Sequence, residues 1–161
     1  MGTMKIGIIV AMDKEFAQLQ KVFGNDPNVV LQKCGIGKVN AARGTQLMID
    51  KYKPSYIINS GVAGALNVEL RPMDIVVGND FVQHDFDLTP LGYAKGNLAT
   101  GDRSKPTVVK ADEQMVALLT EVSRDISGRH EEAGTVTVGR IVSGDQFVNT
   151  PELKAALRDD F

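Results

Sequence analysis

The stretch Lys5-Ile6-Gly7-Ile8-Ile9-Val10 decides the fold, because it is an almost continuous apolar run of strand length. Such a run is typical of a strand that is covered on both faces, as in a parallel sheet. It leads without a linker into Ala11-Met12-Asp13-Lys14-Glu15, and Phe16, Leu19 and Phe23 then follow at helical spacing. The stretch therefore predicts a central strand that passes directly into a helix.

Carboxylates stand just beyond the carboxyl end of this strand, at Asp13 and Glu15. Open α/β sheets bind their ligands at the carboxyl ends of the strands, and carboxylates beside a pocket are candidates for acid–base work. Acidic side chains also favour the first turn of a helix, where the helix dipole is positive. Position alone leaves both interpretations open.

Strand and helix patterns alternate along the rest of the chain. Strands are expected at 29–31, 56–59 and 74–77 and within 136–142. Helices are expected from just after Gly37 to Tyr52, around 115–122 and from Thr150. Asp112 and Thr150 are candidate helix caps, the latter followed by a proline at the first helical position. Residues 84–106 form a long loop of the kind that is functional or disordered. The alternation predicts an α/β fold, with a mixed, mostly parallel twisted sheet flanked by helices.

The composition is that of an ordinary globular protein, with 161 residues, 43% hydrophobic and 24% charged, and a formal net charge of -2. We expect one domain over residues 4–161, with Met1–Thr3 as a cloning remnant before Met4. The single cysteine, Cys34, excludes an internal disulfide and fits a reducing compartment. No apolar run approaches a membrane span, and no basic excess suggests nucleic acid. The expected location is the cytoplasm.

Glycine follows three of the expected strands, at 35–37, 60–64 and 143–144. Glycine lets a backbone approach a ligand closely, so these exits predict a pocket for a flat, polar group such as a base or a sugar. The run Gly35–Ala41 also invites comparison with a dinucleotide-binding loop, although Asn40 stands where a third small residue belongs. The pair His84-Asp85 could orient a base or bind a metal, but two ligands do not make a metal site, and a structural pair is the alternative.

Five motifs together carry a resemblance to a known family. They are Lys5-Ile-Gly-Ile-Ile-Val-Ala-Met-Asp-Lys-Glu15, Cys34-Gly-Ile-Gly-Lys-Val-Asn-Ala-Ala42, Ile57-Ile-Asn-Ser-Gly-Val-Ala-Gly-Ala65, Asp74-Ile-Val-Val77 and Ile141-Val-Ser-Gly-Asp-Gln-Phe-Val148. In this order the chain resembles the bacterial 5′-methylthioadenosine/S-adenosylhomocysteine nucleosidases of the purine nucleoside phosphorylase superfamily. The resemblance implies a three-layer α/β/α fold and covers roughly the first two thirds of the family domain.

The resemblance also implies an activity, the hydrolysis of the N-glycosidic bond of 5′-methylthioadenosine and S-adenosylhomocysteine. Such a reaction needs a base for the attacking water, and Glu15 matches the family's water-activating glutamate. Ala11 and Met12 match the ribose side of the site. Ile36 matches an apolar wall for the 5′-alkylthio group. No cofactor and no metal are implied.

The remaining implied site residues come from later in the chain. Val62, Ala63 and Gly64 match the loop beside the water, sugar and base, with Val62 where the family often has serine. Phe147 matches the ring that stacks on adenine, and Val148 matches the backbone that hydrogen-bonds adenine. The family is homodimeric, and Leu91 matches an aromatic position that the partner subunit contributes to the pocket.

Two departures from the family pattern qualify these expectations. A short turn stands between Phe23 and Val29 where the family has a β-hairpin. The chain contains no Met-Glu dipeptide, the pair that holds the ribose hydroxyls in the family. It also contains no Ser-Asp dipeptide, the pair whose aspartate protonates adenine in the family. The alternatives are a fragment of a working nucleosidase, a truncated module that binds nucleosides or dimerises without catalysis, and a phosphate-dependent phosphorylase.

Overall fold

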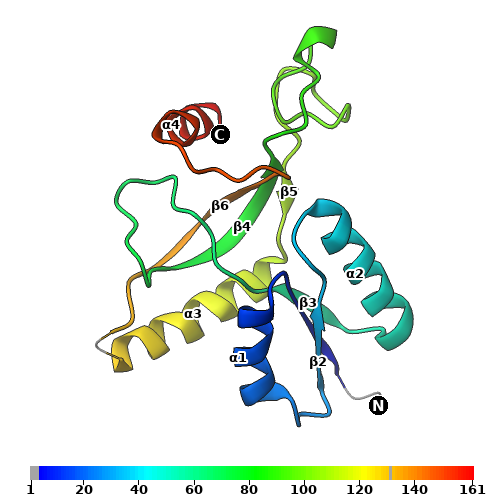
Figure 1. The fold of residues 1–161 in the computed structure, drawn as a ribbon, viewed down its shortest axis with the longest axis vertical. Coiled ribbons are helices and arrows are strands. Elements are labelled where there is room, and N and C mark those ends of the chain that lie inside the picture. The colour runs from blue at the N-terminus through cyan, green and yellow to red at the C-terminus, as the bar shows by residue number, and fades with distance from the viewer. Residues whose placement is uncertain (1–3, 131) are drawn as a thin grey trace. The chain divides into compact units, whose positions relative to one another are not determined.

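The computed structural model describes residues 4–130 and 132–161, in which strands and helices alternate (Figure 1). In chain order the elements are β1 (Ile6–Val10), α1 (Asp13–Phe23), β2 (Val29–Lys33), α2 (Lys38–Tyr52), β3 (Tyr56–Asn59), β4 (Ile75–Gln83), a 3₁₀ turn η1 (Thr89–Leu91), β5 (Val109–Lys110), α3 (Glu113–Arg129), β6 (Val136–Ser143) and α4 (Pro151–Asp160). The chain forms two compact units, one ending at Ala63 and the other spanning Gly64–Phe161. The expectation of a single domain stays a prediction.

The first unit is built on a parallel sheet of order β2-β1-β3, so the apolar run that opens the chain is the central strand, as predicted. Ile8 lies opposite Leu31 on one side and Ile58 on the other. Helices α1 and α2 lie on opposite sides of this sheet (Figure 1). The core gathers around Met48, which is fully buried and packs with Ile9.

The second unit is built on a mixed sheet of order β5-β4-β6, in which β4 runs parallel to β6 and antiparallel to β5. Helix α3 packs against β4 and β6. The pairing of β4 with β6 shifts register between Gly78 and Asp80, so one residue bulges out. The side chain of Asp80 is buried and accepts hydrogen bonds from Arg140 at 2.5 Å and Lys110 at 3.0 Å.

Several predicted elements are confirmed at residue precision. The strand at 56–59 has the predicted bounds. Asp112 caps α3 by accepting from the Met115 N–H, and Thr150 caps α4 by accepting from the Leu153 N–H. These features are local in sequence, which is why a pattern can find them.

The predicted strand at 74–77 is too short, because β4 continues to Gln83. Its second half carries Asn79 and Asp80, and the buried carboxylate is compensated by cations on β5 and β6 that are distant in sequence. The two-residue strand β5 escaped prediction because it is too short for any period. Helix α2 begins at Lys38, directly after Gly37, as predicted.

The long loop after β4 has internal order within the second unit. Asn97 has no exposed surface, and its amide donates to the carbonyls of Asp102 at 2.9 Å and Lys105 at 2.7 Å. The side-chain oxygen of Asn97 accepts from the Thr100 N–H at 3.2 Å. Among the helices of residues 4–130 and 132–161, none combines the length and the apolar character that a bilayer crossing demands.

Candidate active site

The carboxyl ends of the three parallel strands of the first unit lie at one edge of their sheet. Val10 lies opposite Lys33 at the ends of β1 and β2. The pairing continues past the strands, since the Cys34 N–H donates to the carbonyl of Val10 at 2.9 Å and the Ser60 N–H donates to that of Ile9 at 3.0 Å. The segments that follow β1, β2 and β3 therefore meet around the exit of the central strand, the usual ligand edge of a parallel sheet.

Glu15, the third residue of α1, folds its side chain back over the start of its own helix. Its Oε2 accepts from the backbone N–H of Ala11 at 3.1 Å and of Met12 at 2.9 Å. A glutamate at this position commonly satisfies the amide that precedes the helix, and the helix dipole favours its charge. The helix-opening interpretation of Glu15 is thus correct for one of its two oxygens.

The other oxygen of Glu15 faces the segment after β3. Oε1 accepts from the backbone N–H of Val62 at 3.0 Å, a contact between residues that are 47 apart in sequence. A carboxylate offers about four lone-pair directions, and these three N–H groups use three of them. One acceptor direction of Oε1 remains for a further donor, and the half-buried carboxylate is fixed from two loops.

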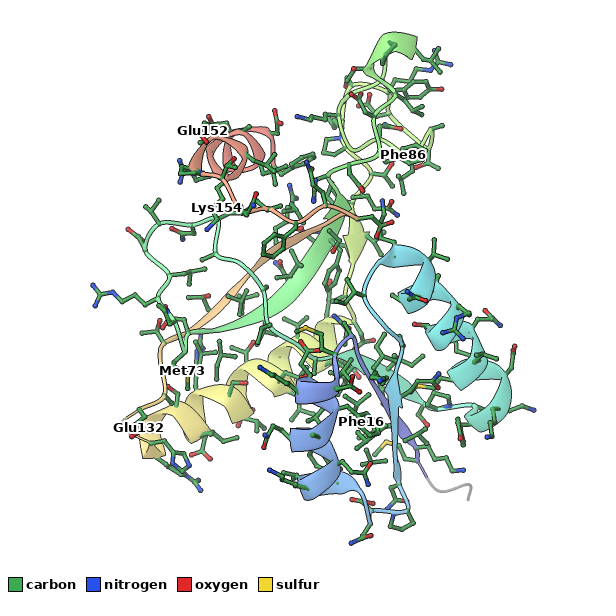
Figure 2. The ribbon with its side chains drawn as sticks, in the orientation of Figure 1. Phe16, Met73, Phe86, Glu132, Glu152 and Lys154 are labelled. Atoms are coloured by element: carbon green, nitrogen blue, oxygen red, sulfur yellow. The ribbon has the colours of Figure 1, made fainter. Side chains whose placement is uncertain are left out.

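Asp13 and Lys14, the other charged residues of this segment, are exposed. Asp13 forms an ion pair with Lys33 on the surface. Of the two carboxylates that the sequence singled out, only Glu15 accepts from both the first and the third strand exit. Phe16 follows Glu15 on α1 (Figure 2).

The exit of β2 presents an apolar side chain between two glycines. Gly35 and Gly37 have φ angles of 97° and 99°, which favour glycine, and they place Ile36 with 72% of its surface exposed. The Asn40 amide donates to the carbonyl of Ile36 at 2.7 Å, so this side chain closes the loop on itself. A dinucleotide loop has a small residue at that position, and the contact therefore argues against the dinucleotide interpretation.

The predicted adenine side falls in the second unit. β4 and β6 end side by side, with Gln83 opposite Ser143, and the Asp145 N–H donates to Asp85 Oδ2 at 2.7 Å. Phe147 follows this exit with 86% of its surface exposed.

Three further predicted residues also lie in the second unit. Val148 is half-buried beside Phe147, Gly64 is exposed at the start of the unit, and Leu91 ends η1 with 67% of its surface exposed. The structure thus joins Ala11, Met12 and Val62 to Glu15 by hydrogen bonds within the first unit. The other predicted site residues named here, Phe147, Val148, Gly64 and Leu91, belong to the second unit.

His84 is a buried packing partner of the β6 exit. It has 5% exposed surface, and a Cβ placed on Gly144 would lie 2.4 Å from its Nε2, so glycine is required there. Among the residues that the structure describes, no group of three His, Cys, Asp or Glu side chains could hold a metal ion. These contacts agree with the structural interpretation of His84.

Sequence reasoning missed how close the backbone at Gly61 comes to Glu15. A Cβ placed on Gly61 would lie 2.8 Å from Glu15 Oε1. The only sequence signal is a glycine after a strand, which does not say what it approaches. The hydrogen bond from the Val62 N–H could not be predicted either. Every residue except proline carries an N–H group, and the sequence does not show which of them lies beside Glu15.

Comparison with known proteins places the chain among nucleoside-cleaving enzymes. Residues 5–161 match the phosphorylase superfamily. The chain is similar to the 5′-methylthioadenosine/S-adenosylhomocysteine nucleosidase of Hydrogenovibrio crunogenus, with 37% identity over 98% of the chain and 72% of the relative. It is also similar to that of Geobacillus thermodenitrificans, with 33% identity over 98% of the chain and 70% of the relative.

A solved structure shares this similarity in three dimensions. The Colwellia psychrerythraea 5′-methylthioadenosine/S-adenosylhomocysteine nucleosidase, crystallised in complex with adenine, superposes with a TM-score of 0.84 at 31% identity, covering 99% of the chain and 70% of its own. This similarity confirms the predicted three-layer α/β fold class.

Proposed function

We infer that this chain, which belongs to the phosphorylase superfamily and within it to the 5′-methylthioadenosine/S-adenosylhomocysteine nucleosidases, hydrolyses the N-glycosidic bond of those two nucleosides. The observation in the structure that carries this proposal is the Glu15 carboxylate. Three backbone N–H groups from two strand exits hold it, and one acceptor direction stays open. That arrangement fits a base that orients and deprotonates water.

The chemistry follows from the charge that develops on the sugar. As the bond between C1′ and adenine N9 breaks, its electron pair leaves with adenine and the ribose gains oxocarbenium character. Water hydrogen-bonded to Glu15 Oε1 attacks C1′ and transfers a proton to the carboxylate, which returns it to solvent, while the departing adenine takes up one proton from solvent. The net reaction places a hydroxyl group on the sugar and a hydrogen on adenine, with no cofactor and no metal.

The residues bonded to Glu15 are proposed to contact the sugar side of the substrate. Ala11 and Met12 belong to the same turn as the base, so a ribose beside the water would lie against them. Val62 and Ala63 are proposed to contact the water and the ribose. The exposed side chain of Ile36 suits the apolar 5′-alkylthio group, since covering it removes apolar surface from water.

Phe147 and Val148 are the proposed adenine contacts. The exposed ring of Phe147 suits stacking on a purine, and Val148 offers backbone groups for its edge. Gly64 completes the loop that begins at Val62. We further propose a homodimer in which the partner subunit contributes its Leu91 position to the pocket, and a cytoplasmic location.

Product analysis with and without phosphate tests the reaction type. Methylthioadenosine is incubated with the protein, and adenine and the sugar product are separated by chromatography. We expect adenine and 5-methylthioribose without phosphate. A sugar 1-phosphate formed only when phosphate is present would instead establish a phosphorylase. Binding of the nucleoside without release of adenine would establish a non-catalytic module.

Futalosine provides a second substrate comparison, because the chain is also similar to the futalosine hydrolase of Helicobacter pylori, with a TM-score of 0.85 at 28% identity over 99% of the chain and 72% of that enzyme. We expect faster adenine release from methylthioadenosine than release of the base from futalosine. The reverse order would overturn the proposed substrate class.

A further inference from the structure

The segment after β3 approaches Glu15 more closely than any side chain at Gly61 would allow. A Cβ on Gly61 would lie 2.8 Å from Oε1, 3.3 Å from Cδ and 3.6 Å from Oε2 of Glu15, and real Cβ atoms essentially never show contacts below 3.0 Å. The φ angle of Gly61 lies outside the left-handed region that favours glycine. The backbone conformation therefore does not require glycine here, but a Cβ at this position would require the Glu15 carboxylate or the loop to shift.

A shift of either the loop or the carboxylate would disturb hydrogen bonds that hold Glu15. The same Oε1 accepts from the N–H of Val62, the residue after Gly61, so withdrawing the loop would lengthen that hydrogen bond. Rotating the carboxylate instead would disturb the hydrogen bonds from Ala11 and Met12 to Oε2. A methyl group at position 61 therefore displaces the carboxylate or breaks its hydrogen bonds.

We propose that Gly61 is a positioning residue for Glu15: the missing side chain lets the loop after β3 hold Oε1 through the Val62 N–H while one acceptor direction stays open. This inference rests on the proposed function for its catalytic consequence, since Gly61 matters to turnover only if Glu15 activates the water. The contact itself is a property of the fold and can be measured without activity.

Thermal melting of four proteins tests the contact: the wild type, Gly61→Ala, Glu15→Ala and the double variant. We expect Gly61→Ala to lower the melting temperature by roughly 3–8 °C when Glu15 is present, because charged hydrogen bonds are strained or lost. In the Glu15→Ala background we expect the same substitution to change it by about 1 °C or less, because the new methyl group then meets no carboxylate. Equal shifts in both backgrounds would overturn the proposal.

A folding failure of the single variant would also be informative. If Gly61→Ala does not fold but the double variant does, the clash with Glu15 is confirmed. If neither folds while Glu15→Ala does, the methyl group clashes elsewhere and the proposal is wrong. Gly128→Ala is the matched control, because a Cβ at Gly128 meets nothing within 4 Å and its φ is also ordinary.

Kinetics of adenine release separate positioning from general destabilisation. Well below its melting temperature, Gly61→Ala should lose about 10- to 100-fold in kcat, with KM within about 2-fold, because a small misplacement of a reacting group is costly. Gly128→Ala should keep the wild-type kcat. An unchanged kcat for Gly61→Ala, even with the melting effect present, would overturn the positioning role of Gly61, whereas the catalytic role of Glu15 itself is tested by Glu15→Gln. A lowered kcat with equal melting shifts would mean that Gly61 acts through another group, which overturns the proposal.

Discussion

Glu15 shows how one side chain can serve the fold and the proposed reaction with different oxygens. Oε2 satisfies amides at the start of α1, and Oε1 reaches the N–H of Val62 across the sheet edge. A base that is held by backbone groups rather than by mobile side chains stays oriented without further support. Because the carboxylate is held so closely, we expect a side chain at Gly61, which lies against it in space, to disturb these hydrogen bonds.

Asp80 is the clearest stabilising residue in the second unit. Its hydrogen bonds with Arg140 and Lys110 hold the pKa of the carboxyl below its ordinary value, although burial acts in the opposite direction. Replacing Asp80 with Asn should lower the free energy of unfolding by about 1–3 kcal/mol, because it leaves Arg140 without its charged partner. Urea denaturation at pH 7 measures this loss.

The pH dependence of Asp80 has a defined sign. Because its pKa is lower in the folded state, the stabilisation is fully present above the pKa of the unfolded chain, about 3.9, and is lost as pH falls through the lower folded value. The gap between wild type and Asp80→Asn should therefore narrow below about pH 4. Asp125→Asn is the control, since its pair with Arg129 is exposed and should contribute less than about 0.5 kcal/mol. A gap that persists at pH 2 would contradict this account.

At the scale of elements, the sequence predicts what is local and periodic. The sequence predicts the strand that ends at Val10 and the strand at 56–59 because each is an almost continuous run of apolar residues. The second half of β4 was not found, because the charge of Asp80 is compensated only by residues that folding brings together. The contact of Glu15 Oε1 with the Val62 N–H was hidden for the same reason, since the two residues are 47 apart in sequence.

The cap of α4 offers a direct test of a local prediction. Thr150 accepts from the Leu153 N–H at 3.2 Å, and Thr150→Ala should cost about 1 kcal/mol and lower the melting temperature by about 2–4 °C. Thr150→Ser keeps the hydroxyl and should recover most of the loss. Equal melting temperatures for the Ala and Ser variants would show that the hydroxyl does not support the helix.

At the scale of the whole molecule, the family match spans both compact units, whereas the Glu15 contacts belong to the first alone. Phe147 and Leu91 present large apolar side chains with 86% and 67% exposure. Covering such surface with a substrate or a second subunit is favourable, which supports the proposed adenine contact and homodimer.

Sedimentation measures the proposed assembly. We expect a species with twice the mass of one chain, and we expect Leu91→Asp to shift it toward the monomer, since a buried unpaired charge is unfavourable. Val68→Asp is the control, because Val68 is similarly apolar and 80% exposed but has no proposed partner contact. A wild type that sediments as a monomer at all concentrations would contradict the homodimer.

The rate of adenine release by Glu15→Gln, measured beside the wild type in phosphate-free buffer, tests the central claim most directly. Glutamine keeps the size of the side chain but supplies no base, so we expect a loss of about 10²- to 10⁴-fold in kcat. Asp13→Asn, which changes the exposed neighbouring carboxylate, should release adenine at the wild-type rate. A Glu15→Gln enzyme that works within about 2-fold of the wild type would show that Glu15 does not activate the water.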